Sequence, residues 1–63
     1  MSAQYAVVYV GDDVEVLHIN LSLREAEDVV ESYKEAAFST GAPGGWDDTQ
    51  SYYTVAWMRN AQT

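Results

Sequence analysis

The chain contains no cysteine, a single proline and only three basic residues among its 63. Without cysteine it has no disulfides and no cysteine metal sites, so a chain this short depends on its apolar core or on a partner for stability. No stretch approaches the roughly 20 apolar residues of a membrane span, and no basic segment precedes the first apolar run. We therefore predict neither a transmembrane segment nor a signal peptide.

Acidic residues are present in excess. Ten Asp and Glu against three Lys and Arg give a formal net charge of −7, while 48% of the residues are hydrophobic and 13% are aromatic. This apolar content predicts one folded domain over residues 1–63 rather than a disordered chain. Such a domain repels nucleic acid and anionic membranes, and a partner attracted by charge should be basic.

Three segments have the composition of β-strands. Residues 4–10, QYAVVYV, are β-branched or aromatic almost throughout and apolar on both faces, which is typical of a central strand. Residues 14–21, VEVLHINL, alternate as a half-buried strand does. Residues 51–58, SYYTVAWM, form the third strand. The Gly11-Asp12 pair is typical of a two-residue hairpin turn between the first two.

Residues 23–37 have the apolar period of an amphipathic helix. Ser22 followed by Glu25 forms a capping box at its start, and Gly41 is a stop signal beyond its end. The apolar side chains share one arc of the helix, namely Leu23, Ala26, Val29, Val30, Tyr33, Ala36 and Ala37. The opposite arc carries Arg24, Asp28, Glu31 and Glu35. A glycine-rich loop, residues 39–50, then leads to the last strand.

The predicted fold is α+β, with the element order β-β-α-β. The helix returns along the sheet, so the third strand pairs beside the first, giving a three-stranded antiparallel sheet of order 2-1-3 with the helix on one face. On the second and third strands we expect Leu17, Ile19, Tyr53, Val55 and Trp57 to face the helix, and Val16, His18, Tyr52 and Thr54 to lie on the other face. The first strand contributes to that other face either Tyr5, Val7 and Tyr9 or Ala6, Val8 and Val10.

One helix cannot cover both faces of this sheet, so an aromatic and β-branched surface should stay exposed. Such a surface marks an interaction face, unless the loop that contains Trp46 folds over part of it.

The acidic residues form three clusters, on the helix, at the hairpin and in the loop. Such charge is either an ordinary solvated surface or a docking surface for a basic partner. Glu27, Glu31 and Glu35 rise by about 6 Å per step along the helix, and like charges at this spacing destabilise a helix slightly. Stability alone would favour more lysine there. The candidate partner-binding residues are Asp12, Asp13, Glu15, Glu27, Asp28, Glu31, Glu35, Asp47 and Asp48.

No motif for catalysis, metal or cofactor binding is present. His18 is the only histidine and has no serine–acid constellation, and a lone histidine without cysteines gives no zinc spacing. The Asp pairs at 12–13 and 47–48 lack the spacing of a calcium loop, and aspartate at turns is favoured for local hydrogen bonds. The stretch GAPGGWDDT lacks the lysine of a phosphate loop. We therefore expect a protein that is not an enzyme and has no metal and no cofactor.

A small, cysteine-free, strongly acidic α/β domain with carboxylates on a helix and a hairpin resembles the phage-encoded inhibitors of bacterial defence, especially the anti-CRISPR proteins. Several of these resemble DNA in charge and block the nucleic-acid site of their target. The resemblance implies a non-enzymatic DNA mimic in the cytoplasm of a bacterial host cell. It would dock onto a basic nucleic-acid-binding protein or complex, such as a CRISPR effector, and would contact neither nucleic acid nor membrane directly.

The alternative function is that of a small adaptor that dimerises through the open aromatic face of the sheet. Because like charge opposes close approach of two copies, we expect a monomer at micromolar concentration.

Overall fold

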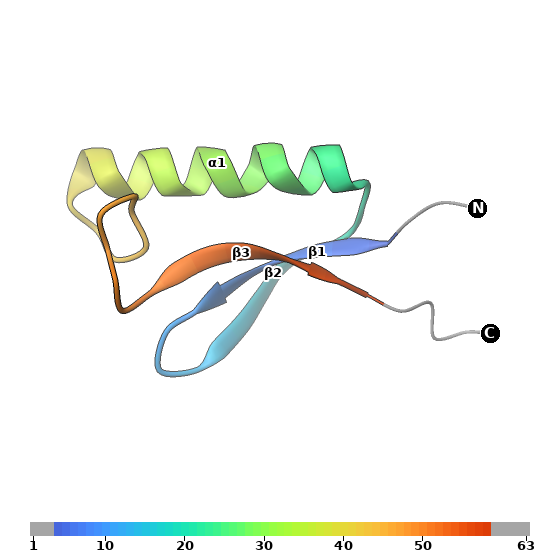
Figure 1. The fold of residues 1–63 in the computed structure, drawn as a ribbon, viewed down its shortest axis with the longest axis horizontal. Helices are drawn as coiled ribbons and strands as arrows, with labels where there is room; N and C mark the ends of the chain where they lie inside the picture. The colour runs from blue at the N-terminus through green and yellow to red at the C-terminus, as the bar shows by residue number, and fades with distance from the viewer. Residues whose placement is uncertain (1–3, 59–63) are drawn as a thin grey trace.

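The computed structural model describes residues 4–58 of the chain. Its elements are β1 (Tyr5–Val10), β2 (Val14–Leu21), α1 (Leu23–Thr40) and β3 (Tyr52–Trp57). β1 pairs antiparallel with both other strands, in the order β2-β1-β3. The helix lies on one side of this sheet (Figure 1). The predicted α+β fold and strand order are therefore confirmed.

The capping residues set both ends of α1. The Ser22 hydroxyl accepts a hydrogen bond from the Glu25 N–H at 3.1 Å, and the Glu25 carboxylate accepts one from the Ser22 N–H at 3.0 Å. Gly41 ends the helix in the left-handed conformation, with φ 75°, and directs its N–H at the carbonyls of Ala37 and Phe38. The capping box and the stop signal are both confirmed, and the helix runs three residues beyond the predicted segment.

The β1–β2 hairpin differs from the sequence expectation in its turn. Val10 pairs with Val14, so three residues rather than two connect the strands. The described residues with positive φ do not include Gly11. The prediction of a two-residue Gly-Asp turn is therefore wrong, since that turn requires a positive φ at its glycine.

Irregular pairing along β2 changes which side chains face the helix. The register shifts between Val7 and Val8, so that Val8 pairs with Val16 while Val7 pairs with His18. A bulge of this kind places residues that are two apart on opposite faces. His18 accordingly contacts α1, with its Nε2 atom 3.1 Å from the Tyr33 hydroxyl. Its predicted place on the open face is wrong.

The register sorts the sheet into two faces, because residues paired directly across strands point to the same side. The face under α1, here called the covered face, carries Tyr5, Val7, Tyr9, Glu15, His18, Leu21, Tyr53, Val55 and Trp57. The face turned away from α1, here called the open face, carries Ala6, Val8, Val10, Val14, Val16, Tyr52, Thr54 and Ala56. Of the two sets left open for the first strand, Ala6, Val8 and Val10 therefore lie on the open face.

A small core and an aromatic cluster join α1 to the covered face. Val7 and Ala26 are fully buried. Tyr33 of α1 stacks on Tyr53, with ring centroids 4.8 Å apart and planes 15° apart, and Tyr9 lies 4.9 Å from the same ring. Burial and the two neighbouring tyrosines raise the pKa of Tyr53 above its usual value. The packing of the cluster therefore favours the neutral form of Tyr53.

The loop between α1 and β3 closes one end of the covered face. Gly44 is buried at φ 96°, and a Cβ atom there would lie 2.6 Å from Cε2 of Tyr53. Trp46 donates a hydrogen bond from its ring nitrogen to the Glu35 carboxylate at 3.1 Å. The loop thus lies against α1. The alternative that the loop with Trp46 folds over the open face is therefore wrong.

Candidate protein-binding site

The hairpin, the loop and the C-terminus of α1 lie at one end of the molecule (Figure 1). A shallow pocket lined by Asp12 and Asp13 on one side and by Pro43 and Ser51 on the other places the hairpin beside the loop. Two of the three predicted acidic clusters, together with the last acidic residue of the helix, therefore come together. We call this group the acidic end; its members are Asp12, Asp13, Glu15, Glu35, Asp47 and Asp48.

The helix itself adds to the negative potential of the acidic end. Unpaired carbonyls give a helix a partial negative charge at its C-terminus, and a basic residue there typically contributes about 0.3–1 kcal/mol. The last turn of α1 contains no basic residue. The Lys34 ammonium lies over the Trp46 ring, 5.4 Å from its centroid. The C-terminus of α1 therefore lacks the stabilisation that a basic residue would give it, and it lies beside the residues of the acidic end.

The carboxylates of the acidic end are not equivalent. Asp48 accepts hydrogen bonds from the backbone N–H groups of Gly44 at 2.9 Å, Gln50 at 2.8 Å and Ser51 at 3.2 Å. These bonds, that from Gly44 foremost, lower the pKa of Asp48 below its usual value. Asp48 therefore holds the loop in shape, whereas the exposed Asp12, Asp13 and Asp47 can meet a partner.

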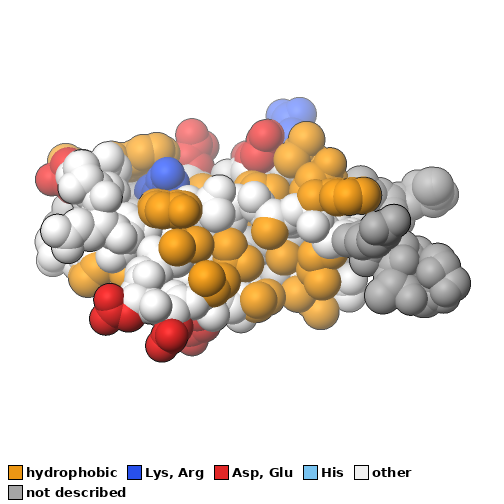
Figure 2. Space-filling model, turned by 60° about the horizontal axis from the view of Figure 1, so that its bottom comes forward, with side chains coloured by type: hydrophobic (Ala, Val, Ile, Leu, Met, Phe, Trp, Pro, Cys, Tyr) orange, Lys and Arg blue, Asp and Glu red, His pale blue; other side chains and the backbone are white. Residues whose placement is uncertain are grey.

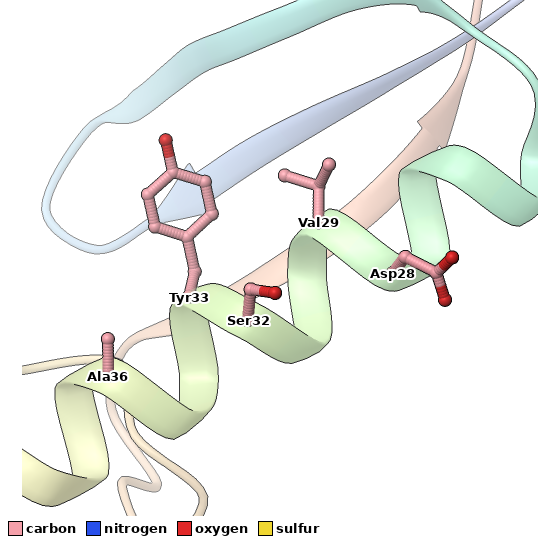
Figure 3. A pocket seen from close by; sticks show the side chains of 5 residues that line it. All are labelled: Asp28, Val29, Ser32, Tyr33 and Ala36. Carbon is pink, nitrogen blue, oxygen red and sulfur yellow. The ribbon is translucent and has the colours of Figure 1, made fainter.

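The other three candidate residues form a ridge along the outer surface of α1, here called the acidic ridge; its members are Glu27, Asp28 and Glu31. All three are exposed. Glu27 and Glu31 border a groove toward β3, and Asp28 borders a second, largely apolar groove on the other flank of the helix. Figure 3 shows Val29 and Tyr33 in that second groove pointing toward the strands, while Asp28 turns away from them. The ridge is thus separate from the acidic end.

The open face is the other exposed surface that stands out. Val14, Val16 and Tyr52 keep 65%, 57% and 47% of their surface exposed. Apolar side chains spread across this side of the sheet, and the acidic side chains in view lie at its margins (Figure 2). The sequence predicted an open apolar face and gave Val10 in one of the two sets for its first strand, but it did not place Val14 on that face.

Sequence reasoning listed the acidic residues but missed that most of them meet at one end. The order of the elements contained the signal: β2 runs away from the hairpin, so the helix that follows it must return toward the hairpin. Its C-terminus, and the loop after it, are then bound to lie near Asp12 and Asp13.

Among residues 4–58, no three His, Cys, Asp or Glu side chains are placed so that they could hold a metal ion. No helix in the same part is long and apolar enough to cross a membrane. Comparison with protein-family models, with curated proteins and with solved structures gives no match to this chain. Its function must therefore be inferred from its surfaces.

Proposed function

We propose that this chain is a non-enzymatic inhibitor that docks its acidic end onto the basic, nucleic-acid-binding surface of another protein or complex. The observation that carries the proposal is the convergence of carboxylates from the hairpin, the loop and α1 beside the C-terminus of that helix. Proteins that bind duplex DNA carry Lys and Arg to match about one negative charge per 1.7 Å of helix axis. The acidic end presents the same sign of charge to such a groove.

The rigidity of the acidic end favours docking. The three hydrogen bonds to Asp48 hold the loop, and Gly41 fixes the end of the helix. A preordered surface loses less conformational entropy on binding than a mobile one does. Complementary charge also speeds association and directs it to basic partners. The target is expected in the cytoplasm of a bacterial host cell, and a CRISPR effector is one candidate, as for the anti-CRISPR proteins that the chain resembles.

A capture experiment tests the proposal with two variants that lose the same number of charges. The immobilised wild-type chain should retain nucleic-acid-binding proteins from a bacterial lysate, and duplex DNA should release them. Asp12→Asn, Asp13→Asn and Asp47→Asn together should lower the affinity for the captured protein at least about tenfold, because charge-assisted contacts are lost. The matched control is Glu27→Gln, Asp28→Asn and Glu31→Gln on the acidic ridge, which should bind nearly as the wild type does.

Two results would contradict the proposal. If the ridge variant loses as much affinity as the end variant, then overall charge and not the acidic end directs binding. If the captured protein holds duplex DNA and this chain at the same time, then docking does not occupy the nucleic-acid site.

A further inference from the structure

The strand pairs place eight side chains on the open face, and none of them is Asp, Glu, Lys, Arg or His. Ala6 and Val8 on the central strand are buried, so the surface that remains belongs mainly to the other six. Its most exposed members, Val14, Val16 and Tyr52, would gain from burial because each leaves a large apolar surface in water. We infer that the open face is an interface between two copies of this chain. The two sheets would pack face to face, with a helix on each outer side. This contact does not involve the acidic end and is independent of the proposed function.

The placement of charge permits a second copy on this face. The acidic ridge consists of exposed residues of α1, and α1 lies on the side of the sheet away from the open face (Figure 1). Packed sheets lie about 10 Å apart, so with a helix beyond each sheet the two ridges would be separated by about 30 Å. This separation exceeds the screening length of about 8 Å at physiological ionic strength. The expectation of a monomer rested on like charge, and the charge of the acidic ridge is remote from this contact.

The shape of the face selects one arrangement of the two copies. Its hairpin end carries the large side chains of Val10, Val14 and Tyr52, which pair across the strands, and its other end carries Ala6 and Ala56. A two-fold axis in the plane of the interface and perpendicular to the strands lays the large end of one copy over the small end of the other. Close packing of apolar surfaces favours this match.

The same axis also separates the acidic hairpins. It places the two pairs of Asp12 and Asp13 at opposite ends of the dimer, about 20 Å apart for strands of this length. An axis parallel to the strands would instead bring both hairpins together and would leave a gap between the alanines. Packing and charge thus favour the same antiparallel arrangement.

The size of the face predicts a weak dimer. Three strands of six residues cover a flat footprint of about 300 Å², whereas a standard interface buries about 800 Å² of each partner. We therefore expect dissociation in the high-micromolar range rather than at nanomolar concentration.

Sedimentation equilibrium over about 5 µM to about 1 mM covers that range. The average mass should rise from monomer toward dimer, and the dimer should strengthen with added salt, because salt screens the remaining repulsion and favours apolar burial. A monomer throughout, or a dimer that weakens with salt, would overturn the inference and leave the open face to a different protein.

Two lysine variants locate the contact. Val16→Lys places a charge on the open face, midway along the edge strand β2, and should abolish the dimer. Leu23→Lys adds the same charge at the start of α1, where the side chain is 44% exposed and not part of the open face, and should dimerise as the wild type does. Circular dichroism checks that both fold; if Val16→Lys does not fold, Tyr52→Ala replaces it and should weaken the dimer at least about tenfold, since a buried aromatic anchor is lost. Equal effects of the face and control variants would contradict the inference.

Single cysteines test the arrangement, because the chain has no cysteine of its own. In the antiparallel dimer Tyr52 of one copy lies over Ala56 of the other. A mixture of Tyr52→Cys and Ala56→Cys chains should therefore crosslink with a short thiol reagent faster than Tyr52→Cys chains crosslink among themselves. The reverse order would overturn the antiparallel arrangement.

Discussion

The two faces of the sheet are built from the same three strands but differ in what covers them, since α1 lies over one face and no described element lies over the other. On the covered face Val7 is fully buried, and the rings of Tyr9, Tyr33 and Tyr53 pack together. On the open face Val16 keeps more than half of its surface exposed. One helix covers one side of the sheet only, and on the open face the central-strand residues Ala6 and Val8 are still buried while the edge-strand side chains of Val14, Val16 and Tyr52 stay exposed. Apolar side chains on the covered face stabilise the fold, whereas the exposed ones on the open face are available for binding.

The largest expected difference between the two faces is in the unfolding free energy lost when one valine on each face is truncated to alanine. Val7→Ala removes two buried methyl groups and leaves a cavity, which should cost about 2–3 kcal/mol of unfolding free energy. Val16→Ala should change that free energy by no more than about 0.5 kcal/mol, as exposed substitutions do. Urea denaturation at a concentration where the chain is monomeric measures both. Equal losses would mean that the open face is part of the core of the monomer.

Alanine substitutions at two glycines with positive φ test whether the loop packs against the aromatic cluster of the covered face. Gly44→Ala would strain a backbone at φ 96° and drive the new Cβ into the Tyr53 ring, so that we expect a loss of about 2 kcal/mol or more. Gly41→Ala has a similar strain at φ 75° but open space around the Cβ, and should cost about 1 kcal/mol. Thermal unfolding compares the two. A smaller loss at Gly44 than at Gly41 would show that the loop does not press on the aromatic cluster.

Asp48 gives the same loop a pH dependence. Folding lowers the pKa of this carboxyl below its usual 3.8. The stability it contributes is therefore complete above the usual pKa and is lost as the pH falls through the lower, folded value. Asp48→Asn should be less stable than the wild type at neutral pH, and the gap should narrow in acid. Asp47→Asn, its exposed neighbour, serves as the control, and a gap of the same size at both pH values would contradict the assignment. The midpoint of urea unfolding at each pH measures the gap.

Most of the fold could be predicted because it depends on local signals. Ser22 with Glu25, and Gly41, act on the backbone within a few residues, and the apolar period of 23–37 gives the helix that they bound. The strand order followed from the apolar composition of both faces of residues 5–10. None of these signals needs knowledge of distant contacts.

The faces of β2 could not be predicted in the same way. An alternating pattern fixes a face only while the register is regular, and a bulge depends on the pairing of two strands rather than on the sequence of one. The pattern therefore placed Val16 and His18 on the same face, although the register shift puts them on opposite faces. The three backbone bonds to Asp48 were likewise hidden, since they depend on the folded shape of the loop.

The smallest expected loss of stability concerns the contact between His18 and Tyr33, which the register shift in β2 makes possible. Because β2 turns His18 toward α1, the histidine and the Tyr33 hydroxyl form a hydrogen bond of 3.1 Å between β2 and the helix. Tyr33→Phe keeps the ring that stacks on Tyr53 and removes only the hydroxyl, so the loss should be about 0.5–1 kcal/mol. Tyr52→Phe makes the same chemical change on the open face and should alter the unfolding free energy of the monomer by no more than a few tenths of a kcal/mol. Chemical denaturation of both variants, with His18→Phe as a second way to remove the bond, measures the difference. If Tyr33→Phe is as stable as Tyr52→Phe, then the bond contributes nothing and stacking alone holds the helix over β3.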